Sequence, residues 1–227
     1  MIILGIETSC DETSVGIVQD GRTILSNTLY SQLKEHERFQ GVVPEIAARK
    51  HLEMINPLLE EAMEQAGVDW NAIDGIAVTN RPGLIGSLLI GLNTAKVLSY
   101  IHQLPLIPVN HIQAHLMAPH MQQDIPFPNI GLVVSGGHTL LYICHDHLDQ
   151  QLMGSTIDDA VGEAYDKVAK FLNLGYPGGP VIDRLAKSGN PDKFPLPVKI
   201  HFKDPRHQYD FSYSGLKTAV TYRVKQR

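Results

Sequence analysis

The start of the chain contains apolar, β-rich runs that predict strands. Apolar residues dominate positions 2–6, and two further β-rich runs cover 14–18 and 23–29. Asp20 and Gly21, between the second and third runs, form a strong signal for a hairpin turn. These runs therefore predict a meander of three strands.

A helical pattern follows the meander. Positions 43–66 are rich in Ala, Leu, Glu and Met, and Gly67 stands where a helix commonly ends. Pro57 is expected to divide or kink this helix because proline lacks a backbone N–H. Strands at 73–79 and 106–109 and helices at 84–101 and 112–118 complete a first lobe with the order βββαβαβα.

The pattern then starts again. Strands are predicted at 130–134, 140–144 and 148–155, and helices at 160–172 and 181–187. Gly131 follows Gly5 by 126 residues, which is the length of a domain, and each stands in a strand before a polar turn. We interpret this as an internal duplication with lobes at 1–125 and 126–227, although any two hairpins share some of this patterning.

Two facing βββαβαβα lobes are typical of the actin-like ATPase and sugar-kinase fold, in which a nucleotide lies between the lobes. A lobe of this type needs on the order of 100 to 150 residues. The second lobe is therefore expected to be incomplete.

Composition and charge narrow the classes of function. The 227 residues are 43% hydrophobic and 19% charged, which is typical of an ordinary soluble protein with a hydrophobic core. A net charge of −5 argues against a chain that binds nucleic acid unaided. The chain has two cysteines, Cys10 and Cys144, which indicates that it has no framework of disulfides. This fits a protein of a reducing compartment. No apolar run reaches membrane-spanning length, so we expect a cytoplasmic protein that does not contact a membrane.

A histidine pair is the first candidate for chemistry. His111 and His115 are four residues apart, so on a helix both imidazoles can reach one divalent ion. A helix opening at Asn110 would also direct unpaired N–H groups at an anion. With 11 histidines in the chain, chance alone gives about half of one such pair, and both rings could simply be hydrogen-bonded.

Two polar turns and a pair of helices carry the other candidates. Asp11 and Glu12 lie in the first hairpin turn and are the candidate catalytic residues, because in a cleft they could orient a metal, a water or an attacking amine; otherwise they are simply solvated. The turn SGGHT at 135–139 lets backbone N–H groups approach a phosphate, and His138 could add a side-chain donor. Asp166 could bind ribose hydroxyls or form a surface ion pair with Lys170.

Six motifs together resemble one known family. They are GIETSCDET at 5–13, VPEIAAR at 43–49, PGL at 82–84, HIQAH at 111–115, VSGGHT at 134–139 and YPGGP at 176–180. In this order they are similar to the tRNA N6-adenosine threonylcarbamoyltransferases, once described as O-sialoglycoprotein endopeptidases. The resemblance runs from Met1 to about Thr218.

The resemblance implies an acyltransferase that moves a threonylcarbamoyl group from threonylcarbamoyl-AMP to N6 of adenosine 37 in tRNAs reading ANN codons. It implies one iron or zinc ion held by His111 and His115. It also implies tRNA bound through a complex with a paralogous partner subunit of actin-like fold and a small P-loop ATPase. The residues that it implies for the adenylate are Val133, Val134, Ser135, Gly136 and Gly137, and those for its nucleoside are Asp166, Gly179 and Asp183.

The sequence departs from the family in its last part. The aspartate that supplies the third metal ligand and a late Gly-rich segment are absent, so we expect a C-terminally truncated form. Two protein ligands are fewer than the three that catalytic zinc sites use, so we also expect weak metal binding. The alternatives are a metallopeptidase, which the missing Glu between the histidines disfavours, and a non-catalytic partner subunit of the same fold.

Overall fold

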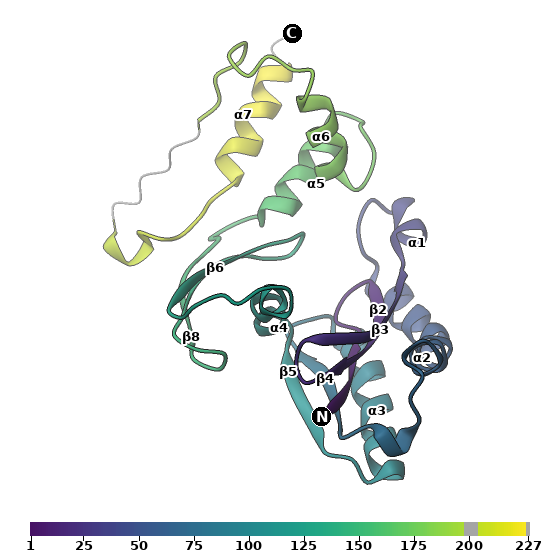
Figure 1. Cartoon of the computed structure of the whole chain (residues 1–227). Helices are drawn as coiled ribbons and strands as arrows, with labels where there is room; N and C mark the ends of the chain where they lie inside the picture. The colour runs from purple at the N-terminus through teal and green to yellow at the C-terminus, as the bar shows by residue number, and fades with distance from the viewer. Residues whose placement is uncertain (198–203, 226–227) are drawn as a thin grey trace. The chain divides into compact units, whose positions relative to one another are not determined.

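The computed structural model describes residues 1–197 and 204–225 (Figure 1). The chain divides into two compact units, Met1–Ile125 and Pro126–Arg227. The first unit is built on a five-stranded sheet and the second on a three-stranded sheet. Among the described residues, no helix combines the length and apolar character that crossing a membrane requires.

The sheet of the first unit has the strand order β3-β2-β1-β4-β5. Its first three strands form the predicted antiparallel meander, and β4 and β5 then add to it in parallel. The carboxyl ends of β1, β4 and β5 therefore meet at one edge of the sheet. The strands are β1 (Ile2–Glu7), β2 (Glu12–Gln19), β3 (Thr23–Ser31), β4 (Gly75–Arg81) and β5 (Leu106–Asn110).

Long helices cover one face of this sheet (Figure 1). Side chains alternate between the two faces of a strand, so every second apolar residue reaches the same core. The buried core joins strand residues Leu4, Ile6, Val15, Ile17, Ile76 and Val78 to helix residues Ile55, Leu58, Ala62 and Ala95. The helices of this unit are α1 (Leu33–Glu37), α2 (Pro44–Ala66), α3 (Ile85–His102) and α4 (His111–Met117), with 3₁₀ turns at Trp70–Ala72 and Ala118–Met121.

Pro57 does not divide its helix. Helix α2 runs without interruption from Pro44 to Ala66, so that part of the prediction is wrong. Pro57 has no N–H and so removes one hydrogen bond of the helix. Ile55 and Leu58, on either side of it, are both buried in the core, and their packing stabilises the helix at this point. The predicted end is confirmed, because Gly67 caps the helix with a left-handed φ of 64°.

The second unit begins with the same meander but has fewer strands. The order β6-β7-β8 is antiparallel throughout, as the predicted duplication requires. Together with the βββαβαβα order of the first unit, this confirms the predicted actin-like α/β class with an incomplete second lobe. The elements are β6 (Asn129–Val134), β7 (Thr139–Cys144), β8 (Gln150–Ser155), α5 (Val161–Phe171), α6 (Gly178–Ala186), a 3₁₀ turn at Pro205–His207 and α7 (Ser214–Lys225).

Candidate metal-binding site

Helix α4 begins directly after β5 and carries both histidines. Ile112 and Leu116 are buried and fix the helix against the unit. The side chain of Asn110 caps the helix by accepting hydrogen bonds from the N–H groups of Ile112 at 2.9 Å and Gln113 at 3.3 Å. Two of the N–H groups that were expected to face an anion at this helix start are therefore paired with Asn110 instead.

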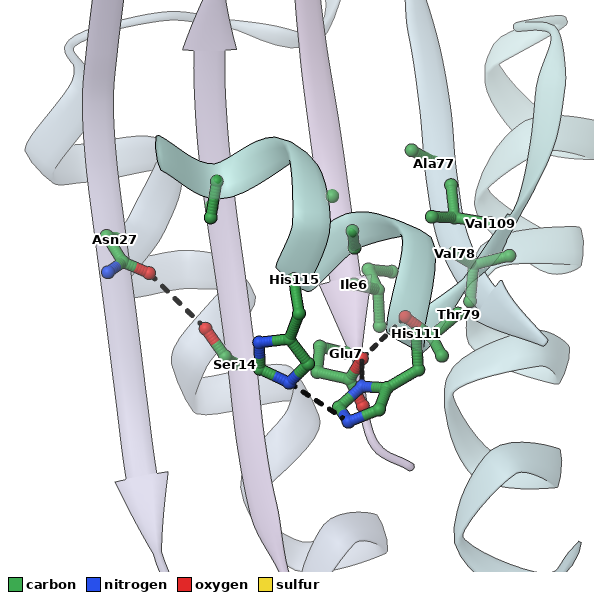
Figure 2. A pocket seen from close by; sticks show the side chains of 14 residues that line it. Ile6, Glu7, Ser14, Asn27, Ala77, Val78, Thr79, Val109, His111 and His115 are labelled. Atoms are coloured by element: carbon green, nitrogen blue, oxygen red, sulfur yellow. Dashed lines mark hydrogen bonds and ion pairs between the residues drawn. The ribbon is translucent and has the colours of Figure 1, made fainter. Parts of the chain in front are cut away.

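The two imidazoles face each other through their Nε2 atoms. The Nε2 atoms of His111 and His115 lie 3.1 Å apart, and the rings meet edge to face with centroids separated by 4.4 Å (Figure 2). The i,i+4 spacing thus brings both rings to one point, as their sequence positions predict. Such an arrangement either shares a proton between the rings or shares a cation.

Glu7 completes this cluster and was not among the residues predicted from the sequence. Its Oε2 atom lies 3.0 Å from Nδ1 of His111 and accepts a hydrogen bond from the Thr79 hydroxyl at 2.6 Å (Figure 2). Its Oε1 atom accepts from the backbone N–H of Ser9 at 2.5 Å. The strand order could have indicated Glu7, because Glu7 ends β1 at the same edge of the sheet where β4 and β5 end.

Charge at the cluster is set by burial and hydrogen bonding. Burial by itself would raise the pKa of Glu7, but hydrogen bonds from His111, Ser9 and Thr79 outweigh it and lower that pKa to about 2. Desolvation, followed by the nearby His111, lowers the pKa of His115. At neutral pH the site therefore combines a carboxylate with a neutral His115 imidazole, which is the form that binds metals.

The histidine pair fits a metal ion in part. Two nitrogens bound to one tetrahedral zinc at roughly 2.0–2.1 Å lie roughly 3.3 Å apart, close to the 3.1 Å between the two Nε2 atoms. Within 1–197 and 204–225, no group of three His, Cys, Asp or Glu side chains is placed to hold a metal ion. The described residues thus offer two histidine ligands to one ion.

The turn after β1 is held by its backbone. The carbonyl oxygen of Ser9 accepts from the Leu84 N–H at 2.8 Å, and that of Asp11 accepts from the Gln32 N–H at 3.0 Å. Asp11 lies in this turn as predicted, but Glu12 does not. Glu12 is the first residue of β2, where it pairs with Ser31 and its side chain is exposed. The placement of Glu12 in the turn was wrong because β2 starts two residues earlier than the apolar pattern indicates.

The neighbouring thiol is not activated. Cys10 is exposed and forms no disulfide. Partial desolvation and the carboxylates of Asp11, Glu12 and Glu7 raise the pKa of Cys10 to about 12. A thiol with this pKa is a poor nucleophile at neutral pH.

A pocket of about 470 Å³ opens between α4 and the sheet face that α2 and α3 leave uncovered (Figure 2). Gly5 and Gly16 pair across β1 and β2 and form part of its floor. Glycine inside a strand weakens it and often marks a place where a ligand or another backbone approaches closely. The polar lining residues are Glu7, Ser14, Asn27, Thr79, His111 and His115.

In the second unit, the predicted Gly-rich turn joins β6 to β7. Ser135 closes it by donating its N–H to the His138 carbonyl at 2.8 Å, and its hydroxyl accepts from the His138 N–H at 3.1 Å. In the described ranges, no group accepts a hydrogen bond from the N–H of Gly136 or Gly137. Val133, just before the turn, is buried, whereas Val134 is exposed. The turn therefore presents two unpaired donors to a ligand.

Asp166 has a structural partner. It accepts a hydrogen bond from the backbone N–H of Gly178 at 2.7 Å and so caps the first turn of α6. No ion pair with Lys170 occurs in the part of the chain that the structure describes, so the surface-pair alternative is wrong. Helix α6 also starts three residues earlier than predicted, which places Gly179 inside it. Asp183, one turn further along, is exposed and lies 3.4 Å from Lys187.

Comparison with known proteins gives one family. The family model described as tRNA N6-adenosine threonylcarbamoyltransferase matches residues 23–226. The curated relative from Brachyspira hyodysenteriae is 54% identical over 226 residues, covering 100% of this chain and 66% of the relative. The one from Treponema denticola is 55% identical over 228 residues, covering 100% and 67%. Both carry the same description as the family, and the chain spans about two thirds of their length.

Solved structures give a weaker likeness. YeaZ from Pseudomonas aeruginosa is 17% identical, with a TM-score of 0.44 over 67% of this chain and 65% of that one. Component A of (R)-2-hydroxyglutaryl-CoA dehydratase from Acidaminococcus fermentans is 13% identical, with a TM-score of 0.46 over 100% and 88%. At these scores the likeness says nothing about function.

Proposed function

Because the chain belongs to the tRNA N6-adenosine threonylcarbamoyltransferase family, we propose that it carries part of the active centre for threonylcarbamoyl transfer. The group passes from threonylcarbamoyl-AMP to N6 of adenosine 37 in tRNAs that read ANN codons. The observation that carries this proposal is the meeting of the His111 and His115 Nε2 atoms at 3.1 Å beside a carboxylate.

In the proposed reaction the N6 amine attacks the carbamoyl carbon. A C–N bond forms, the bond from that carbon to the phosphate oxygen of AMP breaks, and N6 loses a proton. Asp11 in the turn after β1, and Glu12 at the start of β2, are the candidate acceptors of that proton. A divalent ion, iron or zinc, bound by His111 and His115 would supply Lewis-acid stabilisation of the negative charge on the carbonyl oxygen.

The second unit would hold the adenylate. The unpaired N–H groups of Gly136 and Gly137 suit a phosphate, and the His138 side chain would add a further donor. Val133, Val134 and Ser135 complete the proposed adenylate site, with Asp166, Gly179 and Asp183 contacting the nucleoside. For Asp166 this role would use Oδ2, because Oδ1 accepts the hydrogen bond from the Gly178 N–H.

Partners are required by this proposal. A net charge of −5 is unfavourable for binding tRNA unaided, so tRNA would bind through a complex in the cytoplasm. The complex would contain a paralogous subunit of actin-like fold and a small P-loop ATPase. The peptidase alternative finds no support, because Ile112, Gln113 and Ala114 place no carboxylate between the histidines.

Transfer of radiolabelled threonylcarbamate to unmodified tRNA, with the partner subunits present, tests the proposal. The His111→Ala variant should lose the transfer because it loses a ligand of the metal. His145→Ala is the matched control, since His145 is exposed in the turn after β7. Full activity of His111→Ala would refute the metal role, and absence of transfer by the unaltered chain in the complete system would refute the function.

A further inference from the structure

Glu7 has a role toward His111 that its hydrogen bonds define. We propose that Glu7 is a positioning residue that fixes the tautomer of His111, so that the Nε2 lone pair of His111 faces His115. The inference rests on the proposed metal-binding role of the two histidines. It concerns a residue that does not touch the metal or the substrate itself.

The tautomer follows from which groups can donate. An ionised carboxylate only accepts hydrogen bonds, so the 3.0 Å contact between Glu7 Oε2 and His111 Nδ1 needs a proton on Nδ1. The Ser9 hydroxyl, 3.2 Å from the same nitrogen, can then act as a second acceptor. A neutral His111 with its proton on Nδ1 has none on Nε2, which leaves a lone pair there for a metal.

The opposite tautomer would fail at both nitrogens. Nδ1 would then oppose the Glu7 carboxylate with one lone pair against another. The proton on Nε2 would point at His115 Nε2, 3.1 Å away, in the position that a shared cation needs. Glu7 therefore selects between a ring that can bind a metal and one that cannot.

Glu7 is itself held firmly enough to impose this choice. Both of its oxygens are engaged, Oε1 by the Ser9 N–H and Oε2 by the Thr79 hydroxyl. Its backbone ends the central strand β1, in register with Ser14 of β2. The position of the carboxylate is thus fixed by β1 and β4, so Glu7 need not move to accept a hydrogen bond from His111. Carboxylates that orient a metal-binding histidine in this way typically contribute about 10- to 100-fold in metal affinity.

The test is zinc binding by the isolated chain, measured by competition with a chromophoric chelator. Glu7→Gln should weaken Zn²⁺ binding by about 10- to 100-fold, because the amide cannot accept from Ser9, Thr79 and His111 together. Glu45→Gln is the matched control, since among the described residues Glu45 forms its ion pair with Arg49, on the exposed face of α2, and its loss should leave the affinity unchanged. Equal affinity for the Glu7→Gln variant and the unaltered chain would overturn the proposal.

A second measurement reads the tautomer directly. Long-range ¹H–¹⁵N spectra of the metal-free, unaltered chain should show the His111 proton on Nδ1, and Glu7→Gln should shift it toward Nε2. A proton on Nε2 in the unaltered chain would overturn the inference even if the variant does not fold. Neither measurement uses tRNA or adenylate, so a failure of the transferase assay leaves both results interpretable.

Discussion

The Nε2–H group of His51 donates a hydrogen bond to the carbonyl oxygen of Cys10 over 3.0 Å. His51 lies on α2 and is fully buried, whereas Cys10 belongs to the turn that carries Asp11. Since Nε2 must be the donor, Nδ1 accepts from the Thr13 hydroxyl at 2.8 Å. One neutral imidazole thus fixes the turn on both sides of Asp11.

This contact predicts that acid weakens the fold of the first unit. Desolvation lowers the pKa of His51 below its ordinary value of about 6.5. The unfolded chain therefore takes up a proton before the folded one, and the free energy of unfolding should fall as pH drops below about 6.5. His115 has a lowered pKa as well and acts in the same direction.

Urea denaturation at pH 7 and pH 5 measures this effect. His51→Gln should unfold at lower urea concentration at pH 7, because the groups it leaves unpaired cost about 1–3 kcal/mol. It should also lose less stability between the two pH values than the unaltered chain. An equal loss of stability in both proteins would show that His51 does not titrate in this range.

A further prediction concerns the metal. The chain should bind one Zn²⁺ weakly, and binding should raise the midpoint of thermal unfolding in proportion to the logarithm of free zinc. His115→Ala should abolish the rise, since a single imidazole remains, and a chelator should reverse it in the unaltered chain. Calorimetry with and without chelator measures this. A zinc-dependent rise that survives in His115→Ala would place the ion elsewhere.

The sequence predicts well those strands and helices whose buried residues recur at the regular spacing of a strand or a helix. Leu4 and Ile6 alternate with outward residues, and the strand they belong to was predicted almost to its ends. Helix α7 has no buried residue among those described, so no apolar period could reveal it. The role of Glu7 was missed for another reason, because its partner His111 is 104 positions away and only the parallel pairing of β1 with β4 shows which strand ends lie together.

The Gly-rich turn of the second unit predicts a sharp effect at Gly162. A Cβ atom there would lie 2.6 Å from the Ser135 carbonyl oxygen and 2.7 Å from the Gly136 Cα, both rigid backbone atoms. Gly162→Ala should therefore displace the turn and weaken AMP binding at least tenfold, as isothermal titration can measure. Gly215→Ala is the control, because no atom lies within 4 Å of its Cβ position among the described residues. Unchanged AMP affinity in Gly162→Ala would remove the turn from the adenylate site.

The last prediction separates two roles of Asp166. Burial raises the pKa of Asp166, and its hydrogen bond from Gly178 only partly offsets this. Because the raised pKa means that the folded state disfavours the charged form, the carboxylate opposes folding at pH 7. Asp166→Asn keeps an oxygen to cap α6 without the charge and should leave the free energy of unfolding equal or slightly higher. Asp166→Ala loses the cap and should lower it by about 0.5–2 kcal/mol.

Nucleotide binding by the same two variants completes the test. If Asp166 serves only to cap α6, Asp166→Asn should bind AMP like the unaltered chain. If its second oxygen also accepts from ribose, Asp166→Asn should bind AMP several-fold more weakly at unchanged stability. The Gly178 N–H occupies Oδ1, so Oδ2 is the atom that must reach the sugar. Weaker binding in Asp166→Asn would therefore assign Asp166 both roles, whereas unchanged binding would limit it to α6.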